Sequence, residues 1–174
     1  MKDMTQEDKE LSFIDISGRL HYGVIVNYKE NEYDHRKWKI TNLHTLSYSK
    51  SGTLIDTDFD GWISYEEYEG CGMSSGSRPF RFGEVLPYLR PLSSMTEEEF
   101  ENLKEYSGLK YEQLDLASYQ NGTYKCLDFY LSEVPSYVVI LVFDWLNKNH
   151  FDYRGLIEKG LAIAVTEENN PYKE

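Results

Sequence analysis

The sequence predicts an α+β fold, in which a small antiparallel sheet of four to six short strands is packed by three or four helices. Short β-branched and aromatic segments follow one another in the N-terminal half, which is typical of local antiparallel strands. Segments with helical apolar spacing and capping residues lie at the start of the chain and in its C-terminal half. The length of 174 residues suits one domain. We therefore expect a single domain over residues 1–174, with a polar, frayed tail at 166–174.

The first elements are a capped helix and a series of short strands. Thr5 is an N-cap with Asp8 three residues later, which begins a helix that runs to about Ser17 and ends at Gly18. Strands are expected over residues 22–28, 38–48, 53–55 and 62–65. The glycine- and serine-rich stretch 70–77 predicts a flexible loop.

The middle of the chain carries two strong local signals. Thr96 and Glu99 form a capping box that begins a helix, and Gly108 ends it. The pair Asn121-Gly122 is favoured in two-residue turns, so residues 114–129 are expected to form a β-hairpin.

The last third predicts one long helix and two short elements. Between residues 134 and 146 apolar side chains recur at i, i+3, i+4 and i+7, which indicates a helix capped by Ser132. Asp152 is expected to cap a short helix that ends at Gly160, and residues 161–165 to form a last strand.

The charge balance excludes two classes of partner. The chain has 18 Lys and Arg against 30 Asp and Glu, a net charge of −12. Non-specific binding to nucleic acid and binding to anionic membranes both need basic residues, so neither is expected. The polar, acidic start lacks the pattern of a secretory signal, and the two cysteines form no disulfide framework. These features predict a cytoplasmic protein with reduced thiols.

One motif has a defined chemistry. Residues 56–67 fit the calcium loop D-x-[DN]-x-[DN]-G-x5-E of EF-hand proteins at every position. Calcium takes six to eight oxygen ligands, which alternate loop positions and a final bidentate glutamate supply. The candidate metal ligands are Asp56, Asp58, Asp60, Trp62 through its carbonyl, Ser64 and Glu67. No cofactor is required by the sequence, and Ca²⁺ is the one that this motif would bind.

The residues around this motif favour a different structure. Residues 45–55 have the pattern of a strand and turn rather than an entering helix, and the glycines at 70 and 72 leave room for only about one turn of an exiting helix. The alternative is a β-hairpin with Leu54-Ile55 and Trp62-Ile63 as its strands and residues 58–61 as its turn.

Two longer stretches resemble a known set of proteins. Residues 86–99, LPYLRPLSSMTEEE, and residues 149–161, NHFDYRGLIEKGL, are similar to small uncharacterised proteins of Bacteroidetes phages, prophages and mobile elements. A shorter block at residues 19–24, RLHYGV, is similar to the same set. The resemblance implies an accessory protein in the host-cell cytoplasm and implies no activity. It does not include the calcium-like loop.

Both long blocks have two interpretations. As structural corners, Pro87 and Pro91 fix an extended segment before the Thr96 cap, Arg90 pairs with an acidic neighbour, and Gly155 permits close packing of the backbone. Alternatively they share a partner-binding surface, because Tyr and Arg are enriched at binding hot spots. The candidate partner-binding residues are Tyr88, Arg90, His150, Tyr153 and Arg154.

No catalytic residues are predicted. The four histidines lack zinc-ligand spacing, and no Gly-x-Ser-x-Gly nucleophile motif is present. We therefore expect a non-catalytic phage or mobile-element accessory protein that acts through an unknown protein partner. The alternatives are a calcium-binding module that uses residues 56–67 and an acidic inhibitor that mimics DNA.

Overall fold

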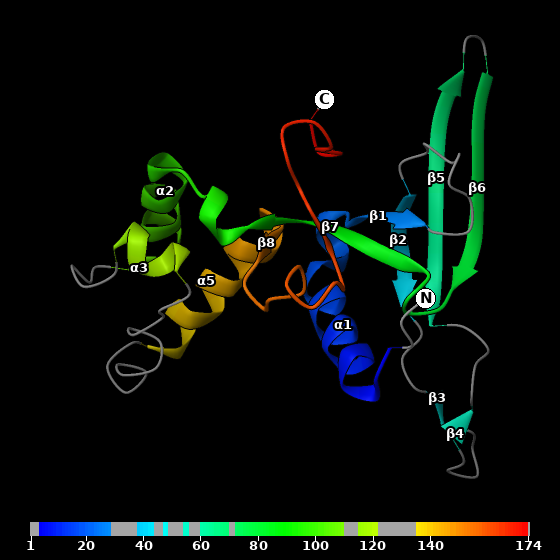
Figure 1. Cartoon of the computed structure of the whole chain (residues 1–174), viewed down its shortest axis with the longest axis horizontal. Helices are drawn as coiled ribbons and strands as arrows, with labels where there is room; N and C mark the ends of the chain where they lie inside the picture. The colour runs from blue at the N-terminus through cyan, green and yellow to red at the C-terminus, as the bar shows by residue number, and fades with distance from the viewer. Residues whose placement is uncertain are drawn as a thin grey trace.

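The protein has an α+β fold in the computed structural model, which confirms the predicted class (Figure 1). The structure describes residues 4–28, 38–43, 47–48, 54–55, 60–69, 72–109, 115–121 and 135–173. The helices are α1 (Gln6–Arg19), α2 (Glu97–Ser107), α3 (Leu116–Gln120) and α5 (Ser136–Lys148), with 3-10 turns η1 (Leu20–Tyr22) and η2 (Leu92–Ser94).

The main sheet has seven strands and is mixed rather than purely antiparallel. Its strands are β1 (Ile25–Tyr28), β2 (Trp38–Leu43), β5 (Gly61–Glu69), β6 (Gly72–Phe80), β7 (Val85–Pro91), β8 (Phe151–Asp152) and β9 (Ile163–Ala164). The order is β6-β5-β2-β1-β7-β8, and β9 also pairs with β7. The short β8 and β9 run parallel to β7, whereas the other pairs are antiparallel. A separate pair joins β3 (Ser47–Tyr48) to β4 (Leu54–Ile55).

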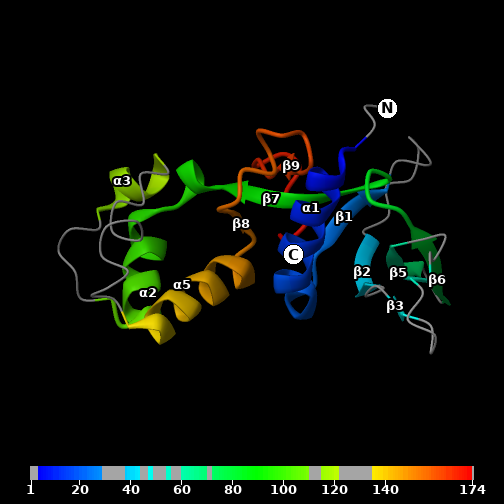
Figure 2. The same cartoon turned by 90° about the horizontal axis from the view of Figure 1, so that it is seen from below.

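Strand β7 connects the two sides of the molecule. Figure 2 shows β7 running from the strands β1, β2, β5 and β6 towards the helices α2, α3 and α5. Apolar clusters lie on both sides: one packs Trp38 and Ile63 of the sheet against Ile16 of α1, and another surrounds Trp145 of α5. A third, smaller cluster around Leu89 of β7 joins them to the C-terminal segment.

Helix α1 begins where the sequence predicts and ends one residue later. Thr5 and Asp8 cap each other's backbone amides in a capping box. Gly18 does not end the helix but lies inside it, at the point where α1 contacts α5. A Cβ atom on Gly18 would lie 3.0 Å from the Nδ2 atom of Asn147. The helical segment of α1 and η1 ends at Gly23, which has the left-handed φ of 75°.

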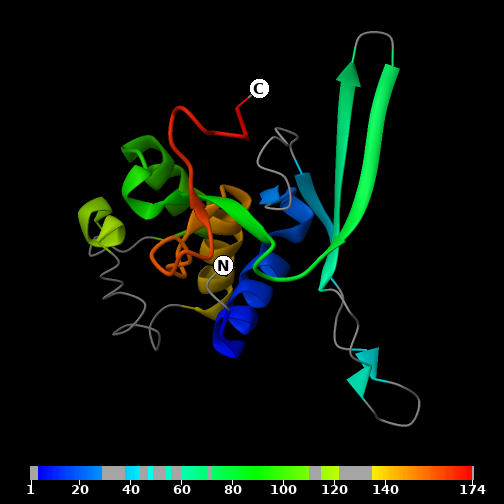
Figure 3. The same ribbon diagram turned by 45° about the vertical axis from the view of Figure 1, so that its right-hand side comes forward.

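The stretch predicted to be a flexible loop is a strand in the structure. Strand β6 pairs with β5 over nine residues, and this hairpin extends beyond the other strands in Figures 1 and 3. Gly76 is paired with Tyr65, and a Cβ atom on Gly76 would lie 2.7 Å from Cε1 of that ring. The glycine is therefore a site of close packing in a strand, where an aromatic ring covers it.

The hairpin predicted over residues 114–129 is wrong for the described part of that range. Residues 116–120 form the short helix α3. Tyr119 is buried 5.7 Å from the ring of Phe100, and the side-chain amide of Gln120 donates to the carbonyl of Met95. Contacts with residues about 20 positions earlier therefore outweigh the local turn signal. Residues 122–134, including Ser132, lie outside the described part of the chain.

The helix predictions for α2 and for the described part of α5 are confirmed. Helix α2 has the capping box of Thr96 and Glu99, and Gly108 ends it with φ of 69°. Helix α5 buries the apolar stripe that includes Val138, Val142, Trp145 and Leu146.

The segment after Asp152 is a turn instead of the expected short helix. The carboxylate of Asp152 accepts hydrogen bonds from the backbone amides of Leu156 and Ile157, at 3.0 and 2.8 Å. Gly155 has a φ of 72°, and a Cβ atom built on it would have no neighbour within 4 Å. The glycine therefore serves the left-handed backbone conformation and not the close packing that was expected. The strand expected over 161–165 is confirmed as the shorter β9.

The C-terminal residues return to the body of the protein where a frayed tail was expected. Tyr172 stacks on His150 at a ring distance of 4.0 Å, and its hydroxyl donates to the carbonyl of Tyr88 at 3.0 Å. Among the described residues, no helix is long and apolar enough to cross a membrane.

Candidate protein-binding surface

The structure does not bring the described calcium-ligand candidates together. Asp60 precedes β5, and its carboxylate accepts a hydrogen bond from the backbone amide of Phe82 at 2.6 Å. Glu67 lies seven residues further along the extended β5. At about 3.3 Å per residue the two are ~23 Å apart along the strand, whereas calcium ligands lie within about 2.6 Å of the ion.

Of the other four predicted calcium ligands, two lie in the described part of the chain and two lie outside it. Trp62 and Ser64 are also on β5, and Asp56 and Asp58 lie outside the described residues. No group of three or more metal-binding side chains is found in the part of the chain that the structure describes. Calcium binding by residues 56–67 therefore stays a prediction, without support from the described residues.

The hairpin alternative paired the wrong strands. Leu54 and Ile55 form β4, which pairs with β3. Trp62 and Ile63 belong to β5, which pairs with β2 on one side and with β6 on the other.

The five predicted partner-binding residues do lie near one another. Tyr88 and Arg90 are on β7, and His150, Tyr153 and Arg154 surround β8. Because β7 pairs in parallel with β8, Arg90 is opposite Phe151, and its backbone amide donates to the carbonyl of His150 at 2.8 Å. The two long blocks of the family resemblance therefore form one unit of structure.

That unit is organised by contacts within the protein. The Arg90 guanidinium makes two hydrogen bonds to the Glu99 carboxylate, at 2.7 and 2.9 Å, and lies over the ring of Phe151. This pairing confirms the expected acidic neighbour of Arg90 and, with the hydrogen bond from Thr96, lowers the pKa of Glu99 against the opposing effect of its burial.

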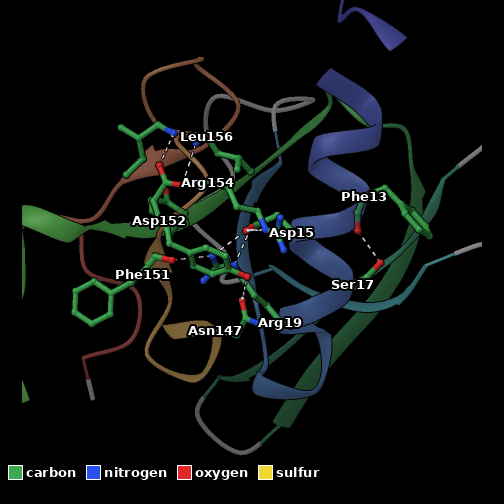
Figure 4. A network of polar contacts seen from close by, with 12 residues as sticks. Phe13, Asp15, Ser17, Arg19, Asn147, Phe151, Asp152, Arg154 and Leu156 are labelled. Carbon is green, nitrogen blue, oxygen red and sulfur yellow. Dashed lines mark hydrogen bonds and ion pairs between the residues drawn. The ribbon is translucent and has the colours of Figure 1, made fainter. Parts of the chain in front are cut away.

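Figure 4 shows the buried network at the centre of this unit. The guanidinium of Arg19 is fully buried and bonds to both carboxylate oxygens of Asp15, at 2.8 and 2.9 Å, and to the carbonyl of Phe151 at 2.7 Å. Arg154 pairs with the same carboxylate at 3.5 Å, and Tyr153 packs under both arginines. These contacts favour the structural interpretation of the two blocks.

His150 is part of the same interior. It is 8 % exposed, and none of the described residues forms a hydrogen bond with its Nδ1 atom. Burial lowers the pKa of His150 to about 4, and the positive charges of Arg19 and Arg90 add to this effect. A neutral, buried imidazole is a poor contact for a partner protein.

The exposed apolar side chains gather elsewhere. Among the described residues, four large apolar side chains are exposed: Ile14, Tyr106, Tyr137 and Ile140. Tyr137 and Ile140 are 62 % and 66 % exposed and follow one another at a helical spacing of three on α5. Asp144 lies four residues after Ile140, on the same side of the helix.

Asp144 joins this part of α5 to two other elements. One carboxylate oxygen accepts a hydrogen bond from the Tyr22 hydroxyl in η1 at 2.5 Å. The other accepts one from the Tyr106 hydroxyl near the end of α2 at 2.7 Å. We call the surface formed by Tyr22, Tyr106, Tyr137, Ile140 and Asp144 the α5 face.

The protonation states of the α5 face are fixed near neutral pH. The two tyrosine hydrogen bonds lower the pKa of Asp144, which is therefore a carboxylate. The same bond to Asp144 raises the pKa of Tyr22 to about 12, and the pKa of Tyr106 rises for the same reason. Both tyrosines therefore remain protonated donors.

Sequence reasoning missed this face. The apolar spacing of α5 counted Tyr137 among the buried residues, although it is on the exposed side. Ile140 carried the usable signal, because it lies off the i, i+3, i+4, i+7 stripe of that helix. The bonds of Tyr22 and Tyr106 to Asp144 span 122 and 38 residues, and no local pattern indicates them.

No family model, curated protein or solved structure matches this chain. The functional argument therefore depends on the geometry of the chain itself.

A pocket of about 340 Å³ with a mixed polar and apolar lining opens between α3 and the turn after β8. Its two acidic residues are Asp152 and Glu158. The Asp152 carboxylate is already engaged by two backbone amides, which fixes the turn. The pocket lining thus offers no pair of free carboxylates for acid–base chemistry.

Proposed function

We propose that this protein is a non-catalytic accessory protein of a phage or mobile element that acts by binding another protein through the α5 face. The observation that carries the proposal is the gathering of three of the four exposed large apolar side chains on that face. Soluble proteins expose such side chains singly as a rule, and a group of them beside polar residues marks an interaction site.

The chemistry of the face agrees with this role. Tyrosine is enriched at binding hot spots, because it offers a large apolar area together with a polar hydroxyl. The hydrogen bonds to Asp144 hold Tyr22 and Tyr106 in place before any partner binds. Less side-chain entropy is then lost when the complex forms, which favours affinity.

The family resemblance supports the phage or mobile-element context. Its two long blocks, residues 86–99 and 149–161, form a frame that consists of β7, β8 and the start of α2. Tyr106 lies near the other end of α2, beyond this frame. The frame and the α5 face are thus separate parts of one molecule, the first structural and the second available to a partner.

Quantitative affinity capture from a Bacteroidetes host lysate tests the proposal. The protein is compared with Ile140→Asp, which places a charge in the centre of the α5 face, and with Ile14→Asp, which does the same at an exposed position on α1. We expect at least one protein whose recovery falls about tenfold or more with Ile140→Asp, as for loss of a hot-spot residue.

The matched control decides the outcome. Ile14→Asp should recover the same protein at the wild-type level, and both variants should keep the wild-type circular dichroism spectrum. Equal recovery of every captured protein by the two variants contradicts binding through the α5 face.

A further inference from the structure

Asp144 retains capacity for a ligand. A carboxylate offers about four acceptor positions, and the two tyrosine hydroxyls occupy two of them. Within the described part of the chain, Asp144 forms no ion pair. Among these residues its negative charge is opposed only by His21 and Lys148, neither of which pairs with it, so the carboxylate can still accept two parallel hydrogen bonds from a guanidinium.

The residues around Asp144 suit the rest of such a ligand. The hydroxyls of Tyr22 and Tyr106 both bond to the carboxylate, which places two aromatic rings beside it, and aromatic rings attract cations. Ile140 is one helical turn away and Tyr137 about two turns, at ~6 and ~10 Å along the axis of α5. Apolar side chains one and two turns from a bound arginine would therefore meet Ile140 and Tyr137.

The neighbouring helix adds negative charge. The exposed residues of α2, the helix that carries Tyr106, include Glu98, Glu101 and Glu105. Lys104 is the basic residue of that helix, and it pairs with Glu101 at 2.5 Å. Within the described ranges, the charges that oppose Asp144 are the exposed Lys148, one turn along α5, and His21, whose ring lies 3.7 Å from the ring of Tyr22. The whole chain has a net charge of −12, which attracts cationic partners over longer distances.

From this arrangement we infer that the partner of the α5 face presents a basic amphipathic helix, whose arginine binds Asp144 between Tyr22 and Tyr106. Its apolar side lies on Ile140 and Tyr137, and its other basic residues face α2. The inference rests on the proposed function and specifies the chemistry of the partner.

A titration with synthetic peptides tests it on the full ¹⁵N-labelled protein. The probe is a helical peptide with one arginine followed by leucines four and seven residues later, on an otherwise alanine- and lysine-containing background. Its matched twin carries glutamate at every basic position. We expect saturable amide shifts at Tyr22, Tyr106 and Ile140 with the basic peptide, and none with its acidic twin.

The Asp144→Asn variant should bind the basic peptide about tenfold or more weakly, because its side chain loses the charge and one acceptor oxygen. Added salt should weaken binding to the wild-type protein. Equal binding of the two peptides, or unchanged affinity of Asp144→Asn, overturns the inference. If Asp144→Asn melts far below the wild type, the inference is tested by comparing the binding of the two peptides to the wild-type protein alone.

The inference and the proposed function fail in different ways. If Ile140→Asp loses a lysate protein that Asp144→Asn still captures at the wild-type level, the α5 face binds a protein and the basic helix is wrong. If Ile140→Asp and Ile14→Asp capture the same proteins, the proposed function itself is wrong.

Discussion

Arg19 and His150 occupy the centre of the protein and differ in how their burial is balanced. Arg19 is fully buried, and its charge is paired with Asp15 through two hydrogen bonds. His150 is almost as buried but has no acidic partner among the residues that the structure describes, and Arg19 and Arg90 lie near enough to oppose its protonation. The buried imidazole of His150 is therefore stable only while it is neutral.

This difference predicts a dependence of stability on pH. The folded pKa of His150 is about 4 and its ordinary value is 6.5, so between these pH values the unfolded chain binds the additional proton. The stability that neutral His150 provides is therefore complete above pH 6.5 and is lost as the pH falls towards 4. The loss in the free energy of unfolding amounts to roughly 3 kcal/mol.

Urea unfolding at pH 7 and pH 4.5 checks this prediction with the variant His150→Asn. Asparagine tolerates the left-handed backbone at this position, where φ is 58°, and does not titrate. The variant should be less stable at pH 7, since the stacking on Tyr172 is lost. Its stability should fall less between the two pH values than that of the wild type, and an equal fall in both proteins contradicts the prediction.

The elements that the sequence predicts correctly are those with local causes. The capping boxes at Thr5 and Thr96 and the left-handed Gly108 involve residues within four positions of one another, and all three are present. The apolar stripe of α5 is equally local. These signals require no knowledge of distant parts of the chain, so one sequence is enough to read them.

The elements that were predicted wrongly have distant causes. Gly18 and Gly76 look like breakers of structure, yet each glycine provides space for a side chain far away, Asn147 or Tyr65. Helix α3 forms where a turn signal lies, because Tyr119 packs on Phe100. In each case a tertiary contact outweighs a local preference, and a single sequence does not show which distant residue makes the contact.

Strand β6 gives a direct test at the scale of one element. Gly76→Ala should lower the free energy of unfolding by about 1–2 kcal/mol, because its Cβ would press on the Tyr65 ring. The second variant, Tyr65→Leu, removes the ring and should reduce this cost in a double-mutant cycle. In a flexible loop the same alanine would instead stabilise the protein by roughly 0.4–1 kcal/mol.

Thermal or urea unfolding gives the sign of the effect. Ser77→Ala is the matched control, since Ser77 is an exposed residue one position along β6, and it should change stability by less than about 0.5 kcal/mol. A stabilising or neutral Gly76→Ala contradicts the pairing of β6 with Tyr65.

At the scale of the whole molecule, β7 organises the fold. It pairs with β1 from the N-terminal half and with β8 and β9 from the C-terminal segment. These parallel partners lie more than 60 residues away in the sequence, which is why the strand β8 and the parallel pairing of β8 and β9 with β7 were not predicted. The same long-range assembly carries Tyr172 back onto His150 and Tyr88.

The candidate site shows the same limit. Of the five residues predicted for partner binding, His150 is buried, Tyr88, Arg90 and Tyr153 are half-buried, and Arg154 is exposed. Arg90 is committed to Glu99, and His150 is buried under Tyr172. The α5 face instead depends on exposure and on bonds between η1, α2 and α5, which exist only in the folded chain.

Site-specific photo-crosslinking tests protein binding through the α5 face most directly. p-Benzoylphenylalanine replaces Tyr137 in one sample and Ile14 in the other, two exposed positions on different helices. After irradiation in host lysate, the protein labelled at position 137 should yield a discrete adduct with a second protein, and the protein labelled at position 14 should not. The same adducts at both positions, or none at position 137, would contradict the account.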